Sequence, residues 1–187
     1  ITAIFGSCGG GLALIPSITD FTFMESEKAK LFVNSPNALE GNYKKKCDTS
    51  SAKWQSSEVG NVDVVADEAT VYAQIRELVS LLPSNNEDAD AYKECSDDLN
   101  RACENLDGAI EDPAVIAGQI ADNGLFFETK RDYAKEMVTG FIRLNGATVG
   151  LVGNRTAIYD ENGKASEKFD DKLTAHACEK AAEFVNF

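Results

Sequence analysis

The sequence predicts an α/β protein, because short apolar strands alternate with helical patterns along the whole chain. Residues 1–5 and 20–24 are predicted strands near the start. A later helical pattern places apolar side chains at three- and four-residue spacing, at Val71, Ile75, Leu78, Val79 and Leu82. In the second half, Asn145-Gly146 separates two apolar segments, which is typical of a β-hairpin because both turn residues take positive φ.

The first half is predicted to hold four strands, at residues 1–5, 20–24, 29–33 and 62–66. An apolar helix over residues 10–17 contains Pro16, which kinks or ends a helix. Residues 35–37 are a turn or a helix start, and the polar residues 40–57 are a surface loop or a frayed helix. The amphipathic helix then begins after Asp67-Glu68 and ends at Pro83.

The second half is predicted to follow a linker at residues 84–112, which are rich in acids and have one short helix around residues 97–104. Pro113 starts a helix that Asn123-Gly124 closes as a left-handed cap. A strand at 126–128 and hairpin strands at 138–144 and 148–152 follow. A second turn is expected at Asn162-Gly163, and a final helix over residues 166–184 with a stripe at Phe169, Leu173, Ala177, Ala181 and Phe184.

The composition is that of a globular protein, with 43% hydrophobic and 26% charged residues. A length of 187 residues suffices for one sizeable core or two small ones. The net charge of −13 excludes general nucleic-acid binding, because an acidic surface repels phosphate backbones. Apolar runs such as residues 12–15 are too short to span a membrane. An acidic average does not exclude one local anion site, since a helix start binds anions through peptide N–H groups.

The cysteine pattern predicts reduced thiols and a cytoplasmic location. The five cysteines are widely spaced, none forms a Cys-x-x-Cys pair, and His176 is the one histidine. These residues do not make a structural zinc site. Widely spaced cysteines in odd number are typical of proteins in a reducing compartment.

The most informative motif lies between a strand and an apolar helix and is Gly6-Ser7-Cys8-Gly9-Gly10-Gly11. Three consecutive glycines remove every Cβ from one side of the turn, so a ligand can approach the backbone. The N–H groups of Gly10 and Gly11 belong to the first helical turn and have no intrahelical partner. Two such donors aimed at one point form an oxyanion hole. Alternatively, the glycines only permit a tight turn and close strand–helix packing.

The glycine motif does not match two other glycine-rich motifs, the P-loop and the dinucleotide-binding fingerprint. No Gly-Lys-Ser/Thr follows, as a P-loop requires, and no acid stands where the dinucleotide fingerprint needs one.

The residues around the glycine motif resemble the carboxyltransferase subunits of biotin-dependent acyl-CoA carboxylases, of the acetyl-CoA and propionyl-CoA carboxylase beta type. In the first half, the resemblance is carried by Thr19-Asp20-Phe21-Thr22-Phe23-Met24, Leu31-Phe32-Val33 with Pro36, Ala52-Lys53, Gly60, Ile75-Arg76-Glu77-Leu78 and Leu81-Leu82-Pro83. In the second half, it is carried by Tyr133-Ala134-Lys135, Val138-Thr139-Gly140-Phe141, Arg143, Asn145-Gly146 and Val149-Gly150-Leu151-Val152-Gly153-Asn154.

The resemblance implies two crotonase-like (ClpP/crotonase) domains in tandem. Residues 1–83 would be the C-terminal part of the first domain, on the acyl-CoA side. Residues 84–112 would be the linker, and residues 113–187 the N-terminal part of the second domain, on the carboxybiotin side.

The implied enzyme is a biotin-dependent acyl-CoA carboxyltransferase, which moves a carboxyl group between biotin's ureido nitrogen and the α-carbon of a short acyl-CoA. By this resemblance, the N–H groups of Gly10 and Gly11 are catalytic and hold the enolate oxygen, while Gly9, Ser7 and Cys8 contact the substrate. No metal is needed at this step.

The resemblance also implies partners. They are a biotin carboxyl carrier protein, which brings the biotin, and a biotin carboxylase, and the subunit forms a homo-oligomer, either a dimer or a hexamer.

Two departures from the family pattern concern the loop before the amphipathic helix. Ser50-Ser51 stand where the family has a glycine pair, and Trp54-Gln55 stand where a histidine is common. The chain also begins without Met and stops in a helical pattern at Phe187, before the second domain's own glycine loop. We therefore expect an internal segment of a longer polypeptide that is catalytically incomplete by itself.

Two other functions remain open. A crotonase-type hydratase or isomerase shares the glycine helix start and needs an acid near the thioester, but Glu25 and Glu27 come after the strand. The hairpin over residues 141–152 also argues against a hydratase or isomerase. The segment could instead be an inactive fragment that acts only in assembly.

Three further groups have a structural and a functional interpretation. His176 is a packing or capping residue, or else a base. Cys8 is a small packing residue, since no histidine nearby in sequence activates it. The run Lys44-Lys45-Lys46 is a solvated loop, or else it attracts the phosphates of CoA.

Overall fold

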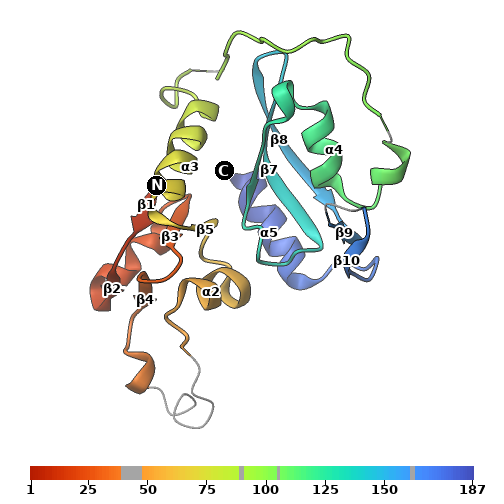
Figure 1. The fold of residues 1–187 in the computed structure, drawn as a ribbon. Helices are drawn as coiled ribbons and strands as arrows, with labels where there is room; N and C mark the ends of the chain where they lie inside the picture. The colour runs from red at the N-terminus through yellow and green to blue at the C-terminus, as the bar shows by residue number, and fades with distance from the viewer. Residues whose placement is uncertain (39–47, 89–90, 105, 161–162) are drawn as a thin grey trace. The chain divides into compact units, whose positions relative to one another are not determined.

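The computed structural model describes residues 1–38, 48–88, 91–104, 106–160 and 163–187 (Figure 1). The chain forms two compact units. The first holds Ile1–Ile75, Lys130–Tyr133 and Phe187, and the second holds Arg76–Thr129 and Ala134–Asn186. None of the helices in the described part of the chain is long and apolar enough to cross a bilayer.

The strands of the first unit form two parallel sheets. In one, β1 (Thr2–Ile4), β3 (Thr22–Glu25) and β5 (Val64–Ala66) pair in the order β1-β3-β5; in the other, β2 (Ser7–Gly9) pairs with β4 (Lys30–Phe32). Parallel neighbours need crossover connections. These contain the 3-10 helices η1 (Gly10–Leu14), η2 (Pro16–Ile18) and η3 (Pro36–Ala38), the short helix α2 (Ala52–Trp54) and the π-helix η4 (Gln55–Val59).

The core of the first unit surrounds β3, whose four residues are all buried. Phe23 and Met24 are 0% exposed, as expected for the central strand of a parallel sheet that is covered on both faces. One apolar cluster joins Ile4, Ala13, Met24, Ala29, Leu31, Ala52 and Val62. Because Ala13 of η1 belongs to this cluster and Cys8 of β2 packs against it, the segment from β2 to η1 is anchored to the core at both ends.

Helix α3 (Glu68–Leu81) begins in the first unit and ends in the second. Asp67 caps it, since Oδ1 accepts the N–H groups of residues 69 and 70 at 3.0 and 3.1 Å. Val71 and Leu78 are fully buried, which confirms the amphipathic helix. Val79 is 56% exposed, so its place on the buried stripe was wrong. It lies about 100° around the helix from Leu78, and Leu81 is buried in its stead.

The second unit is built on an antiparallel sheet with the order β6-β7-β8. Its strands are β6 (Phe126–Thr129), β7 (Met137–Leu144) and β8 (Ala147–Asn154), and a separate ribbon pairs β9 (Ala157–Tyr159) with β10 (Ala165–Lys168). The 3-10 helices η5 (Asp107–Ala109) and η6 (Asp122–Gly124) stand on either side of α4 (Pro113–Ile120). The last element is α5 (Ala175–Asn186).

Helices α4 and α5 cover opposite faces of this sheet (Figure 1). Ile142 of β7 forms a buried cluster with Ala117 of α4 and with Ala121. Its neighbour Phe141 contacts Phe184 of α5, with ring centroids 4.9 Å apart. Successive residues of a strand point to opposite faces, so the two helices must lie on different sides of β7.

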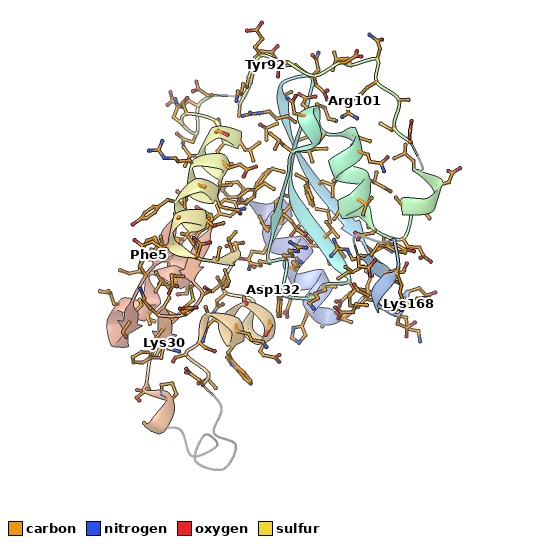
Figure 2. The ribbon with its side chains drawn as sticks, in the orientation of Figure 1. Phe5, Lys30, Tyr92, Arg101, Asp132 and Lys168 are labelled. Atoms are coloured by element: carbon orange, nitrogen blue, oxygen red, sulfur yellow. The ribbon has the colours of Figure 1, made fainter. Side chains whose placement is uncertain are left out.

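The hairpin between β7 and β8 is the one predicted from Asn145-Gly146, whose φ angles are 50° and 85°. The carboxylate of Asp122 accepts the N–H of Asn145 at 2.9 Å and that of Gly146 at 2.6 Å. Tyr92, labelled in Figure 2, pairs with Ala147, so residues 91–93 run beside the hairpin. The predicted helix start at Pro113 is also confirmed, with Asp112 as its N-cap.

Several sequence-based predictions were wrong. Residues 97–104 form turns, not a helix, and the nearest helical turn is η5. The final helix starts at Ala175, because residues 165–168 form β10, which pairs with β9. The helix at residues 10–17 is divided into η1 and η2, with Pro16 as the first residue of η2. Asn123-Gly124 has positive φ but lies in η6, after α4 has ended.

Two predicted features fall on residues outside the described part of the chain. The run Lys44-Lys45-Lys46 lies entirely there. Of the predicted turn Asn162-Gly163, Asn162 lies there too, and Gly163 has a φ of 71°.

Candidate functional site

The glycine motif begins as a strand in the structure. The prediction of a turn over all six residues was wrong, because Ser7, Cys8 and Gly9 form β2 and pair with β4. Strand β4 begins where the Lys30 N–H donates to the Gly6 carbonyl at 3.0 Å. Ser7 is exposed, and Cys8 is half-buried and packs against the core of the first unit. The strand therefore holds the start of the glycine run at a fixed place on the core.

The three glycines differ in whether the structure has room for a Cβ at their positions. A Cβ on Gly9 would lie 2.7 Å from the Phe32 ring of β4. Gly10 has a φ of +64°, a conformation that costs a residue with a Cβ about 1–2 kcal/mol. A Cβ on Gly11 would meet nothing within 4 Å. Packing and backbone conformation thus account for Gly9 and Gly10, whereas the space next to Gly11 is open.

The chain turns from β2 directly into η1, so Gly10 and Gly11 are the first two residues of a 3-10 helix. The first N–H groups of a helix have no carbonyl partner within it. The N-cap is Gly9, which has extended backbone and no side chain to accept them. An oxygen atom of a ligand can take the place of a capping side chain at such a position.

Apolar side chains surround this helix start. Leu12, Leu14, Ile15 and Ile18 are between 47% and 83% exposed, while Ala13 and Pro16 are buried. The segment after the glycines therefore presents an apolar surface beside the backbone donors.

The carboxylate of Glu25 already accepts hydrogen bonds from the protein backbone. Its Oε2 accepts the N–H groups of Glu27, Lys28 and Ala29 at 3.2, 2.5 and 3.3 Å. The hydrogen bond from the Lys28 amide is the largest cause of a lowered pKa at Glu25, so this carboxylate is ionised and shapes the turn between β3 and β4. Neither this acid nor the exposed Glu27 fits the acid–base role that a hydratase needs.

His176 lies near the start of α5 and its side chain is 68% exposed. Its Nδ1 lies 3.4 Å from Oε2 of Glu179, one helical turn further on. The prediction of a partly buried packing residue was wrong, because α5 turns this position toward solvent.

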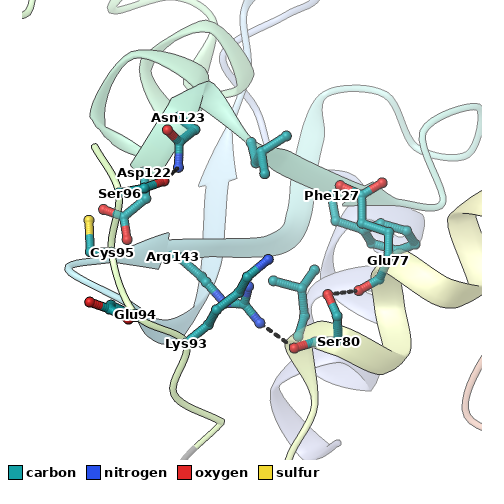
Figure 3. A pocket seen from close by; sticks show the side chains of 12 residues that line it. Glu77, Ser80, Lys93, Glu94, Cys95, Ser96, Asp122, Asn123, Phe127 and Arg143 are labelled. Carbon is teal, nitrogen blue, oxygen red and sulfur yellow. Dashed lines mark hydrogen bonds between the residues drawn. The ribbon is translucent and has the colours of Figure 1, made fainter. Parts of the chain in front are cut away.

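Sequence reasoning did not find a pocket of about 110 Å³ in the second unit. Figure 3 shows it between the last turn of α3, the segment before η5 and strand β7, with Ser80, Lys93, Asp122 and Arg143 in its wall. Its wall comes from segments far apart in sequence, so no local pattern indicates it.

The described residues contain no group of three or more His, Cys, Asp or Glu side chains arranged to hold a metal ion. The four cysteines described, Cys8, Cys95, Cys103 and Cys178, are free thiols.

Comparison with known proteins identifies the family. Residues 1–187 match the carboxyl transferase domain. The chain belongs to the carboxyl transferase family. The resemblance predicted from the glycine motif and its flanks is therefore confirmed over the whole chain.

Two relatives illustrate the match. The propionyl-CoA carboxylase beta chain of Roseobacter denitrificans is 30% identical over 205 residues, which cover 100% of this chain and 37% of that protein. The methylmalonyl-CoA decarboxylase subunit alpha of Propionigenium modestum is 31% identical over 169 residues, covering 84% of this chain and 33% of that protein. The chain thus spans about a third of the length of these relatives.

The fold is shared with a solved structure of the transcarboxylase 12S subunit, a hexamer with hydrolysed methylmalonyl-CoA bound. That structure superposes with a TM-score of 0.81 and 30% identity, covering 99% of this chain and 36% of the other. The predicted α/β, crotonase-like fold is confirmed.

Proposed function

We propose that this chain takes part in transferring a carboxyl group between biotin and a short acyl-CoA. Membership of the carboxyl transferase family supports this, as do relatives whose names specify propionyl-CoA and methylmalonyl-CoA as substrates. The related 12S structure with a CoA derivative bound supports an acyl-CoA as the other reactant.

The observation that carries the proposal is the backbone at Gly10 and Gly11. Strand β2 ends at the first turn of η1, and neither of these two residues carries a Cβ that could obstruct a ligand next to its backbone. When a carboxyl group joins or leaves the α-carbon, negative charge moves onto the thioester oxygen. Two backbone donors fixed directly after a paired strand stabilise this charge without reorganising. Each such donor contributes about 10²–10³-fold to the rate in other enzymes.

The rest of the substrate contact is proposed for the residues next to these donors. Gly9 shapes the approach of the ligand through its backbone, since the Phe32 ring fills the space where its Cβ would lie. Ser7 and Cys8 flank the ligand, and the exposed apolar side chains of η1 and η2 receive the acyl group.

Biotin would supply the carboxyl group from a partner carrier protein loaded by a biotin carboxylase. No residue of the second unit is assigned to biotin. The division into residues 1–83 for the acyl-CoA side and 113–187 for the biotin side, with a linker at 84–112, is part of this proposal. So are a cytoplasmic location and assembly into a homo-oligomer, as in the hexameric 12S relative.

The proposal is tested by a pair of substitutions at Gly11, where the structure has room for a side chain. Gly11→Pro removes the N–H donor, and proline is tolerated in the first turn of a helix, but it also restricts the backbone of the preceding Gly10, whose φ is +64°. Gly11→Ala keeps the donor and adds a methyl group on the side of the ligand. In biotin-dependent carboxyl exchange by the polypeptide that carries this sequence, we expect Gly11→Pro to lower kcat by about 10²-fold or more.

Gly11→Ala should mainly raise KM, because it narrows the approach and leaves the donor in place. Gly108→Ala is the matched control, since its Cβ also meets nothing within 4 Å and it lies in the second unit. Unchanged exchange in Gly11→Pro would show that this amide does not hold the oxygen. Absence of exchange with every short acyl-CoA would refute the reaction itself.

A further inference from the structure

The pocket of the second unit contains a buried donor that lacks an acceptor. Arg143 projects from β7, and its Nη2 donates to the backbone carbonyl of Ser80, near the end of α3 (Figure 3). Its Nε is buried and has no hydrogen-bond partner among the described residues. A charged donor without an acceptor is costly in a protein interior, so such a group indicates that something else completes the site.

The charges in the wall limit the ligand that this donor can hold. Lys93 places a second cation in the wall of the same pocket. The nearby acid Asp122 is committed, because its two oxygens accept the N–H groups of the hairpin turn. Glu77 and Glu94 also line the pocket, and they disfavour a dianion. With Asp122, the wall carries three acids against two cations, so it admits at most one negative charge, held by a direct hydrogen bond to Nε of Arg143.

The rest of the wall is apolar. Leu81, Leu125 and the buried Phe127 line the pocket together with the cations. A volume of about 110 Å³ admits only a few non-hydrogen atoms. A ligand with a hydrogen-bond acceptor at one end and a short hydrocarbon at the other matches this mixture of charged and apolar lining residues.

We infer that this pocket binds a small aliphatic monocarboxylate, with its oxygens on Nε of Arg143 and its hydrocarbon against Phe127. The guanidinium geometry favours a carboxylate, whose two oxygens can accept parallel N–H bonds. The site lies in the second unit and does not include the glycine motif. If monocarboxylate binding is not found, the proposed carboxyl transfer is not affected.

The test is a titration of the 187-residue chain with acetate, propionate and butyrate at constant pH and ionic strength, followed by backbone amide chemical shifts. We expect saturable shifts at residues 93–96 and 122–125, which form part of the wall. Affinity should rise up to about fourfold for each added CH₂ that is buried. Inorganic phosphate at the same ionic strength distinguishes a carboxylate site from a general oxyanion site, and phosphate binding tighter than butyrate would overturn the inference.

Three variants make the result specific. Arg143→Gln should weaken butyrate binding about tenfold or more, as expected for the loss of a charged hydrogen bond. Glu77→Gln should tighten it several-fold because a competing negative charge is removed, and a folding defect cannot produce a gain. Arg76→Gln, on the exposed side of the same helix and outside the pocket wall, is the matched control and should change nothing.

Linear shifts without saturation would overturn the inference, as would equal losses in Arg143→Gln and Arg76→Gln. If Arg143→Gln does not fold, the Glu77→Gln gain and the chain-length series still decide the question, and the absence of both rejects the site.

Discussion

At the scale of single residues, the second unit contains a buried charge cluster centred on Arg155. Its Nε lies 2.7 Å from Oδ1 of Asp112 and its Nη2 lies 3.3 Å from Oε1 of Glu128. The side chains of Arg155 and Asp112 are each 4% exposed, so both charges are removed from water. The same Asp112 oxygen accepts the N–H of Ala114 and caps α4. The cluster thus joins the start of α4 to the chain that follows β8.

Replacing Arg155 with Met should strongly destabilise the second unit. The substitution keeps much of the side-chain volume but leaves the buried Asp112 and the half-buried Glu128 beside an apolar group. Breaking a buried ion pair from one side costs about 3–5 kcal/mol, because an uncompensated charge stays in the interior. The free energy of unfolding, measured by urea denaturation at neutral pH, should fall by this amount.

The matched control for Arg155→Met is Lys172→Met, which removes an exposed cation 3.6 Å from Asp170. Water already solvates both of these groups, so no measurable change is expected. Similar losses in the two variants would show that burial does not determine the contribution of Arg155.

At the scale of elements, two glycines in hairpin turns share a conformation but differ in their surroundings. Gly146 has a φ of +85° and its Cβ would lie 2.1 Å from the Lys93 carbonyl oxygen. Gly163 has a φ of +71° and its Cβ would meet nothing within 4 Å. An alanine suffers backbone strain at both positions, and a collision with backbone only at the first.

Gly163→Ala should therefore lower the free energy of unfolding by about 1–2 kcal/mol, the cost of a Cβ in the left-handed region. Gly146→Ala should lower it at least twice as much, because the segment at residues 91–93 must also move away from the hairpin. Equal losses in thermal unfolding of the two variants would show that the segment docks too loosely to resist the added methyl group.

Elements with strong local signals were predictable from the sequence. The β7–β8 hairpin follows from Asn145-Gly146, and the start of α4 follows from Pro113. The start of α5 was missed because Phe169 and Leu173 continue its helical spacing backwards. Pairing of β10 with β9 overrides that spacing, and the true start is marked by Thr174, whose Oγ1 accepts the Ala177 N–H at 3.1 Å.

The candidate site was predictable only in part, for a similar reason. The glycine run and the helix start after it are visible in the sequence, and the family resemblance gives them a role. That Ser7 to Gly9 form a strand depends on pairing with β4, more than twenty residues away. The close approach of Phe32 to Gly9 depends on the same pairing. The pocket around Arg143 requires four chain segments to meet, and such contacts leave no local pattern.

At the scale of the whole molecule, the chain has two compact units with separate cores. Met24 is fully buried in the cluster of the first unit, and Ile142 is 2% exposed in a cluster of the second. Only α3 and the segment Lys130–Tyr133 carry the backbone from one unit into the other before the final residue. Because few backbone segments connect the two units and each unit has its own core, we expect the two units to unfold independently of each other.

Two reciprocal substitutions test this independence by amide hydrogen exchange. Met24→Ala and Ile142→Ala each leave a cavity in one core and should cost about 2–5 kcal/mol there. With Met24→Ala, protection should fall in β1, β3 and β5 and stay unchanged in β7 and β8. With Ile142→Ala the pattern should reverse. If each substitution lowers protection equally in both sheets, the chain unfolds as one cooperative body, and the proposed division into an acyl-CoA side and a biotin side loses its support in the energetics of this chain.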